Sequence, residues 1–172
     1  MVNVVLVDSN DAEIGQMEKV AAHMGDGTMH RAFTAIVFNH LGETLIAQRS
    51  ADKMLWPLVW DNTCASHPLP DEDYVTAGER RLSEELGFSC KLIVADIFAY
   101  SAKYKDIGSE NELCATLIGE YNGEINPVAD EVADYKWINI PDLKADMADS
   151  PDKYTIWFKI AIDRLIEQGK IK

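Results

Sequence analysis

Five side chains have donor atoms suited to a divalent cation: His23, His30, His67, Glu110 and Glu112. The first two histidines flank the turn-forming run Gly-Asp-Gly at residues 25–27. Because side chains alternate along a strand, the two glutamates of Glu110-Asn111-Glu112 would point the same way and could share one ion. Three imidazoles with two carboxylates suit Mn²⁺, Zn²⁺ or Mg²⁺ in near-octahedral coordination. Any one of these histidines alone would more often be a packed or surface residue.

A second acidic group lies near the end of an expected helix. Residues 80–88 read Arg-Arg-Leu-Ser-Glu-Glu-Leu-Gly-Phe and resemble the second half of the Nudix box, Arg-Glu-apolar-x-Glu-Glu-x-Gly-apolar. The glutamate that directly follows the arginine in that box is replaced here by Arg81. Adjacent carboxylates near a diphosphate make an oxygen-ligand site for Mg²⁺. The alternative is a solvated helix face on which Arg80/Glu84 and Arg81/Glu85 form ion pairs four residues apart.

The most specific resemblance lies in residues 56–68, Trp-Pro-Leu-Val-Trp-Asp-Asn-Thr-Cys-Ala-Ser-His-Pro. This run is similar to the active-site segment of type I isopentenyl-diphosphate isomerases, in which an aromatic loop leads into Asn-Thr-Cys-Cys-Ser-His-Pro. Three more segments resemble that family: Glu18-Lys19-x-x-x-His23, Met29-His30-Arg31-Ala32-Phe33 and Glu110-Asn111-Glu112. The similarity extends from Glu18 to about Trp157, which is nearly the whole chain.

The resemblance implies a Nudix-like enzyme that moves a double bond in a prenyl diphosphate by adding one proton and removing another. Glu112 and Tyr100 match the family's groups on one face of the substrate. Ala65 stands where the family has its catalytic cysteine on the opposite face. The His/Glu set would hold Mn²⁺, Zn²⁺ or Mg²⁺, and Glu85 would bind the Mg²⁺ that accompanies the diphosphate.

The resemblance also implies which residues bind the substrate. Lys19, Arg49 and Lys53 fall where the isomerases have basic residues for the diphosphate, and either side-chain type can bind phosphate. Trp157 matches the tryptophan whose ring would stabilise a tertiary carbocation in a site that excludes water. Without the resemblance, Arg49 and Lys53 would be interpreted as solvated charges, and Trp157 as a packing residue on an amphipathic helix.

Ala65 leaves three hypotheses open. The first is an isopentenyl-diphosphate isomerase whose catalytic cysteine has been replaced, which would disable or weaken turnover. The second is a Nudix-type diphosphate hydrolase that needs Mg²⁺ at Glu84 and Glu85. The third is a non-catalytic protein that binds prenyl diphosphates. Cys64 is adjacent, but successive side chains in an extended segment point in opposite directions, so it is not expected to replace the missing thiol.

The pattern of apolar and turn-forming residues predicts an α+β fold. Strands are expected at residues 2–7, 31–38, 43–49, 88–100, 112–121 and 134–140, with turns at 39–42 and 122–123. Helices are expected at 17–24, at 71–86 with Gly87 as its C-cap, and from Pro151 through Gln168. Because strands and helices do not alternate regularly, we expect a Nudix-like mixed sheet with helices packed on it, in one domain spanning residues 1–172.

Composition excludes several classes of function. A formal net charge of −13 argues against a nucleic-acid partner. Three scattered cysteines favour a reducing compartment over a disulfide framework. The first residues lack a basic leader, and no apolar run approaches the roughly 20 residues of a membrane span. We therefore expect a cytoplasmic protein without a membrane partner, acting on a small molecule, with a monomer favoured.

Overall fold

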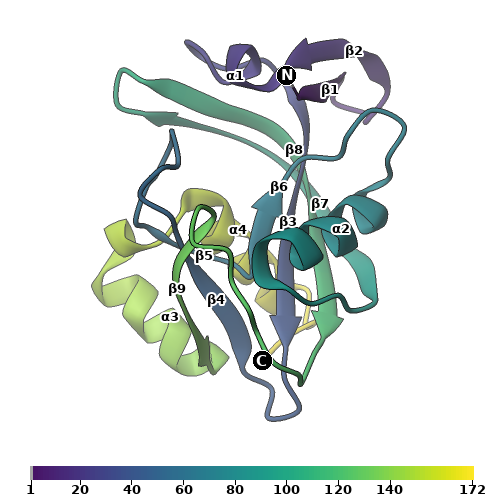
Figure 1. The fold of residues 1–172 in the computed structure, drawn as a ribbon. Helices are drawn as coiled ribbons and strands as arrows, with labels where there is room; N and C mark the ends of the chain where they lie inside the picture. Colours follow the sequence, from purple (N-terminus) through teal and green to yellow (C-terminus); the bar gives the residue numbers. More distant parts are fainter. Residues whose placement is uncertain (1) are drawn as a thin grey trace.

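The computed structural model describes residues 2–172, which form a mixed β-sheet covered by helices (Figure 1). The strands are β1 (Asn3–Val7), β2 (Glu13–Glu18), β3 (His30–Phe38), β4 (Thr44–Arg49), β5 (Trp60–Asp61), β6 (Cys64–Ser66), β7 (Leu92–Tyr104), β8 (Gly108–Glu120) and β9 (Val132–Ile138). The helices are α1 (Lys19–Ala22), α2 (Tyr74–Leu86), α3 (Ile140–Asp149), the 3₁₀ turn η1 (Pro151–Lys153) and α4 (Ile156–Glu167). The predicted α+β fold is confirmed.

Strand β3 is the centre of the sheet. It pairs in parallel with β8 from His30↔Glu112 to Phe38↔Glu120, and antiparallel with the short strand β6 on its other side. Strand β4 contacts β3 only at its end and pairs with β9 and β5, while β8 continues into a long hairpin with β7. Residues of β6 and β8 therefore flank β3 on opposite sides.

The two faces of the sheet carry separate apolar cores, because successive residues of β3 point to opposite faces. Ala32 and Ile36 belong to the core that α3 and α4 complete, with Phe158 and Leu165 among its fully buried members. On the other face, Phe33 packs in the core that is completed by α2. The sheet is thus the middle layer between α2 and the α3/α4 pair.

Helix α2 begins and ends where its capping residues predict. Asp73 precedes it and accepts a 2.8 Å hydrogen bond from the amide of Thr76, which satisfies a free N–H of the first turn. Gly87 ends it in the left-handed conformation at φ 71°, which suits a residue without a side chain. The predicted helix 71–86 is therefore confirmed, with its first turn starting at Tyr74.

Two other predicted helices differ from the structure. Residues 17–24 were expected to be helical, but β2 continues through Glu18 because it pairs with β1, and only the single turn α1 follows. The predicted helix 151–168 is interrupted at Tyr154 and Thr155. These residues are extended because Tyr154 bridges to Trp60 and the Thr155 amide donates to the Trp60 carbonyl at 3.0 Å.

The strand boundaries also shift in one region. Strands β7 and β8 extend beyond the predicted ranges 88–100 and 112–121 towards the turn that joins them. Their ladder runs from Leu92↔Gly119 to Tyr104↔Gly108 and is interrupted only by a bulge after Val94. Strand β9 ends at Ile138, and helix α3, which the sequence did not predict, starts at Ile140. Asn139 caps this helix by accepting from the amide of Asp142 at 2.8 Å.

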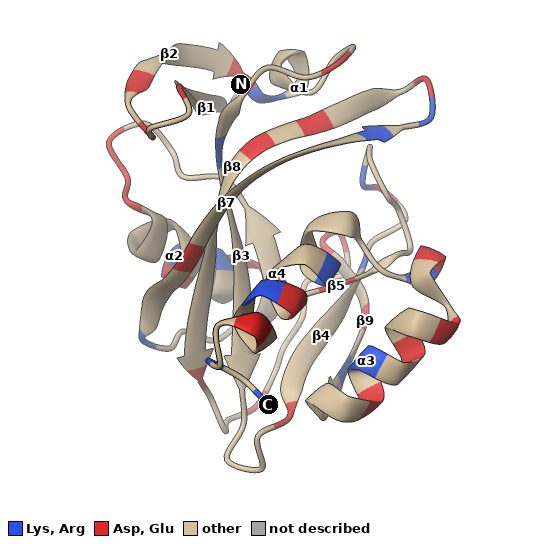
Figure 2. Cartoon of the chain, turned by 180° about the vertical axis from the view of Figure 1, so that it is seen from behind, with Lys and Arg blue, Asp and Glu red and all other residues tan. Residues whose placement is uncertain are grey.

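Acidic residues are distributed over several elements of the outer surface, including α3 and α4 (Figure 2). None of the helices within residues 2–172 has both the length and the apolarity needed to cross a bilayer.

Candidate active site and metal cluster

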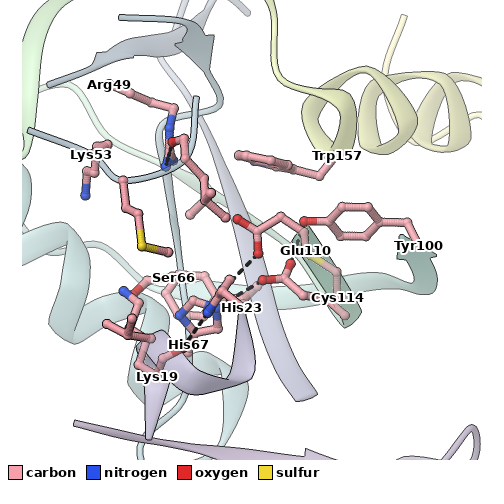
Figure 3. Close-up of a pocket in the computed structure, with 16 residues that line it drawn as sticks. Lys19, His23, Arg49, Lys53, Ser66, His67, Tyr100, Glu110, Cys114 and Trp157 are labelled. Carbon is pink, nitrogen blue, oxygen red and sulfur yellow. Dashed lines mark hydrogen bonds and ion pairs between the residues drawn. The ribbon is translucent and has the colours of Figure 1, made fainter. Parts of the chain in front are cut away.

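A cavity of about 150 Å³ opens on the α4 side of the sheet, beside the start of β3. Strands β6, β7 and β8, helix α1, the segment after β4 and the N-terminus of α4 all contribute to its wall (Figure 3). Most of the residues that the sequence singled out line this one cavity: Lys19, His23, Arg49, Lys53, Ala65, His67, Tyr100, Glu110, Glu112 and Trp157.

The His/Glu set forms a cluster at the deep end of the cavity. One donor atom from each of the five residues lies within 4.8 Å of the others. His23 caps the C-terminus of α1, His30 is the first residue of β3, and His67 directly follows β6. Glu110 and Glu112 point the same way from β8, as strand alternation predicts. The structure thus brings together residues from four separate segments.

The protonation pattern of the cluster fits a bound cation. The Nδ1 atoms of His23 and His30 lie 2.6 Å from the Lys19 carbonyl and 2.7 Å from the Thr28 carbonyl, so each must donate its proton there. In a neutral imidazole each Nε2 then directs a lone pair inward. His23 Nε2 lies 2.9 Å from Glu110 Oε2, and although burial would lower the pKa of His23, the hydrogen bond and charge of Glu110 raise it. Two facing acceptors need a proton or a cation between them. Imidazoles anchored by backbone carbonyls are the usual arrangement of metal-binding histidines.

His67 completes this donor set in its neutral form. Its Nε2 lies 3.0 Å from Glu112 Oε1, and its Nδ1 is buried without a hydrogen-bond partner among the described residues. Burial, and then the charge of Lys19, hold the pKa of His67 well below its usual value. A neutral imidazole is the form that binds a metal.

Glu112 connects the cluster to Tyr100 on the wall of the cavity. Its Oε1 faces His67 and His30, and its Oε2 accepts a 2.6 Å hydrogen bond from the Tyr100 hydroxyl. Burial alone would raise the pKa of Glu112, but the neighbouring His30 imidazole and the hydrogen bond from the Tyr100 hydroxyl keep it below the usual value. Burial, and then the Glu112 charge, raise the pKa of Tyr100 well above its usual value, so the phenol stays a proton donor.

The three basic residues that the sequence assigned to a diphosphate lie around the cavity. Lys19 keeps some exposed surface, yet partial burial, followed by the charges of Lys53 and Arg81, lowers its pKa. Lys53 forms an ion pair with Glu131, and Arg49 donates to Asp61 and to two backbone carbonyls. Arg81, at the position where the Nudix box has glutamate, also pairs with Glu131 at 2.9 Å. Arg49, Lys53 and Arg81 thus have acidic partners here, and diphosphate binding by Lys19, Arg49 and Lys53 stays a prediction.

Glu85 lies outside the main cavity. It is buried on α2 and lines a smaller adjoining cavity, which shares Arg49, Lys53 and Ala65 with the main one. Its Oε1 accepts a 3.0 Å hydrogen bond from Arg81 Nε, and Arg80 pairs with Glu84 at 3.1 Å. The ion pairs of the alternative hypothesis for this helix are therefore present, and the role of Glu85 as a Mg²⁺ ligand stays a prediction.

Ala65 lines the cavity, and Cys64 does not. Strand alternation explains this difference: Ala65 packs against the core on the α4 side, while Cys64 is buried in the core on the α2 side. The position of the family's cysteine therefore offers only a methyl group. Cys114, which sequence reasoning missed, does line the cavity, and its position two residues after Glu112 could have indicated this. Burial, and then the Glu112 charge, raise the pKa of the Cys114 thiol well above normal.

Trp157 forms the aromatic wall of the cavity from the first turn of α4. Its ring packs edge-on against Trp56 at 5.2 Å between centroids, lies 6.0 Å from the Tyr100 ring, and has the Arg49 guanidinium 5.3 Å from its centroid. Its indole N–H donates to Asp61 at 2.8 Å, a partner that the sequence did not indicate.

Comparison with known proteins assigns the chain to a family. The family model described as the NUDIX domain matches residues 28–158. An isopentenyl-diphosphate Delta-isomerase from Burkholderia multivorans is 40% identical over 160 residues, which cover 93% of this chain and 90% of that protein. An enzyme of the same name from Haloarcula marismortui is 39% identical over 171 residues, covering 94% and 89% of the two chains. The chain belongs to the isopentenyl-diphosphate Delta-isomerase family.

Solved structures agree with the Nudix fold of this family member. A Deinococcus radiodurans protein, DR0079, superposes with a TM-score of 0.70 at 18% identity, covering 86% of this chain and 90% of its own. A MutT protein from Methanosarcina mazei gives a TM-score of 0.67 at 17% identity, covering 83% and 96%. These likenesses establish the fold. The Nudix match begins at residue 28, so three of the residues lining the main cavity, Lys19, Val20 and His23, precede it.

Proposed function

We propose that this chain has the site of an isopentenyl-diphosphate isomerase, for the conversion of isopentenyl to dimethylallyl diphosphate, with turnover weakened by Ala65. The observation that carries the proposal is the hydrogen-bonded pair Tyr100–Glu112, which sits beside the five-donor cluster in the same cavity as Ala65 and Trp157. A diphosphate hydrolase has no need of a buried phenol–carboxylate pair facing an aromatic wall.

The reaction adds a proton to the terminal alkene carbon and removes another from the carbon next to the diphosphate-bearing one. The species between these steps is a tertiary carbocation. Glu112 and Tyr100 would exchange a proton on one side of the substrate, while position 65 faces it from β6, across β3. Trp157 and Trp56 would exclude water and present their rings to the cation.

Two metal ions are part of the proposal. His23, His30, His67, Glu110 and Glu112 would hold Mn²⁺, Zn²⁺ or Mg²⁺, which when bound supplies positive charge that lowers the pKa of the groups beside it. Glu85 would bind Mg²⁺ together with the diphosphate, and Lys19, Arg49 and Lys53 would neutralise the remaining phosphate charge. The carboxyl–imidazole donor set supports the first site. For the second site, the support is that the buried Glu85 carboxylate lines the adjoining cavity beside Arg49 and Lys53, which would bind the diphosphate.

Ala65 provides no proton donor or acceptor. We therefore expect Ala65→Cys to raise the isomerisation rate by roughly 10²–10⁴-fold, the usual contribution of one general acid or base. The double substitution Cys64→Ala with Ala65→Cys is the matched control, and it should match the single variant because Cys64 does not line the main cavity with Tyr100 and Glu112, only the adjoining one.

The same assay separates the alternatives. If Ala65→Cys binds substrate and metal but keeps the rate of the unmodified chain, the isomerase proposal is wrong, and a non-catalytic prenyl-diphosphate binding protein remains. Phosphate release from isopentenyl diphosphate or from a nucleoside diphosphate would instead identify a Nudix-type hydrolase.

The setting of the reaction is also proposed. We expect a monomeric, cytoplasmic protein whose partner is a small prenyl diphosphate rather than a nucleic acid or a membrane. The enclosed cavity, a net charge of −13 and three free cysteines support this expectation. Sedimentation of the protein with and without ligand measures the oligomeric state directly.

A further inference from the structure

Asp61, on the two-residue strand β5, is a buried carboxylate behind the main cavity rather than in its wall. Only 4% of its surface is exposed. Its Oδ1 accepts hydrogen bonds from the Asn62 amide at 2.9 Å, the Thr155 hydroxyl at 2.8 Å and the Trp157 indole N–H at 2.8 Å. Its Oδ2 accepts from Arg49 at 3.1 Å. Four donors converge on this group, which is the surrounding expected of an ionised carboxylate.

Asp61 accepts a hydrogen bond from the hydroxyl of Thr155, the N-cap residue of α4. Thr155 occupies the N-cap position, yet its side chain makes no hydrogen bond to an amide of the first turn in the described chain. Its hydroxyl donates to Asp61 instead. The carboxylate is thus held at the positive end of the helix, which favours a negative charge there. The Thr155 hydroxyl therefore bonds to Asp61 on β5 instead of to an amide of its own helix, and this long-range bond fixes the start of α4 to β5.

The same carboxylate fixes the orientation of Trp157. The indole has one polar atom, and that N–H is bound by Asp61, so rotation of the ring would break a charge-assisted hydrogen bond. Trp56 packs edge-on against the ring at 5.2 Å. These two contacts hold the Trp157 ring in one orientation, with one face towards the cavity.

Asp61 also offsets the charge of Arg49 beside that ring. The guanidinium lies 5.3 Å from the Trp157 centroid, and it also donates hydrogen bonds to the carbonyls of Leu55 and Trp56. If Arg49 were unpaired, its charge would interact with the negative potential of the Trp157 ring, which a substrate cation needs. Burial raises the pKa of Asp61, while the Arg49 charge opposes that rise.

We propose that Asp61 is a positioning residue for catalysis: it fixes the Trp157 ring and, through the indole N–H bond, keeps that ring electron-rich towards a carbocation in the cavity. This inference rests on the proposed function, because only a reaction through a cation uses the potential of the ring. A carboxylate that accepts the indole proton increases the electron density of the ring, because hydrogen bonds polarise their donors. If Asp61 had only a structural role, it would hold α4 in place without changing the affinity of the Trp157 ring for a cation.

The test compares two diphosphates of the same shape, one with a tertiary ammonium in place of the branched carbon and one with a neutral branched alkyl group. The ratio of their affinities measures how strongly the site prefers a cation. In the unmodified chain with Mg²⁺ the ammonium compound should bind more tightly. Asp61→Asn should reduce that ratio by roughly three- to thirtyfold, the size of a cation–π contribution.

Two matched variants isolate the indole bond. Thr155→Val removes another donor to Asp61 and should leave the ratio unchanged. In Trp157→Phe, which has no N–H, a further Asp61→Asn substitution should lower the ratio less than it does beside Trp157, and the remaining change measures the charge of Arg49. If folded Asp61→Asn keeps the ratio of the unmodified chain, the inference is overturned, even when both affinities fall together.

A measurement on the unmodified chain covers the case in which Asp61→Asn does not fold. The Trp157 indole N–H signal in a nitrogen-15 NMR spectrum, assigned by its loss in Trp157→Phe, should lie at low field and exchange slowly with solvent. A signal at the position of a free, exchanging indole would contradict the bond and overturn the inference. If the unmodified chain binds neither diphosphate, the proposed function is what fails, and the inference falls with it.

Discussion

Tyr100 and Glu112 are direct cross-strand partners in the β7–β8 ladder, and the Tyr100 hydroxyl donates a 2.6 Å hydrogen bond to Glu112 Oε2. The pairing of the strands therefore places a proton donor on the one carboxylate oxygen that does not face the histidines. The other oxygen lies 3.0 Å from His67. One carboxylate thus joins a metal-binding cluster to a phenol through opposite oxygens.

Removing this phenol should slow the reaction without emptying the cluster. In the Ala65→Cys background, we expect Tyr100→Phe to lower kcat by roughly 10–100-fold, since a hydrogen bond to a charged group contributes about 1.5–3 kcal/mol. Metal content, measured by elemental analysis, should stay the same. Tyr104→Phe is the matched control, because the Tyr104 hydroxyl makes no hydrogen bond within residues 2–172. An equal loss in both variants would contradict the role of Tyr100.

Loss of one imidazole should empty the His/Glu cluster. We expect His67→Ala to abolish stoichiometric metal binding and to lower the melting temperature, because a metal that binds only the folded state stabilises it. Metal analysis after dialysis, with calorimetry, measures both effects. His40→Ala is the control, since His40 is exposed in a turn and bonded to Asn122. Unchanged stoichiometry in His67→Ala would remove His67 from the ligand set.

The proposed second metal site would depend on Glu85. We expect Glu85→Gln to raise the Mg²⁺ concentration needed for diphosphate binding by roughly tenfold or more, because a charged oxygen ligand is lost. Titration calorimetry with inorganic diphosphate at several Mg²⁺ concentrations would measure this. Glu84→Gln, on the adjacent and more exposed position, should change it little. Equal effects of the two variants would favour the solvated ion-pair interpretation of this helix.

Acid should weaken the contact between α4 and β7. Hydrogen bonds from Arg164, and then from Gln168, hold the pKa of Asp96 below its usual value. A depressed carboxyl pKa stabilises the fold above the unfolded-state value of about 3.9, and this stabilisation is lost as the pH falls through the folded value.

Urea unfolding from pH 7 to pH 3 tests this expectation. The unmodified chain should be more stable than Asp96→Asn at pH 7, by at most about 1 kcal/mol because solvent screens the pair. The difference should shrink towards zero below about pH 4. A difference that is constant across the whole range would show that the contact does not depend on the ionisation of Asp96.

Local signals in the sequence were sufficient for elements that form local bonds. Gly87 marked the end of α2, and the alternation of Glu110 and Glu112 correctly placed both carboxylates on one side of β8. Residues 17–24 were predicted wrongly because the pairing of β2 with β1 overrides helix propensity. Helix propensity is a weak prior that tertiary contacts often override.

The site could be predicted only through the resemblance to a known family. His23, His30 and His67 are far from Glu112 in the sequence, and no spacing rule brings them together. Asp61 was missed for the same reason: its partners Thr155 and Trp157 lie about a hundred residues away. An aspartate in an aromatic loop carries no sequence signal of a contact with the start of the last helix.

His23 and Lys19 lie on a segment that precedes the part of the chain matched by the Nudix domain. That segment reaches the cavity because β1 and β2 form a hairpin beside the start of β3, with α1 directly after it. The part of the chain matched by the Nudix domain therefore supplies most of the cavity wall, and the segment before residue 28 supplies the rest. Exchanging residues 2–27 between members of the family would thus alter one side of this cavity while leaving the matched domain unchanged.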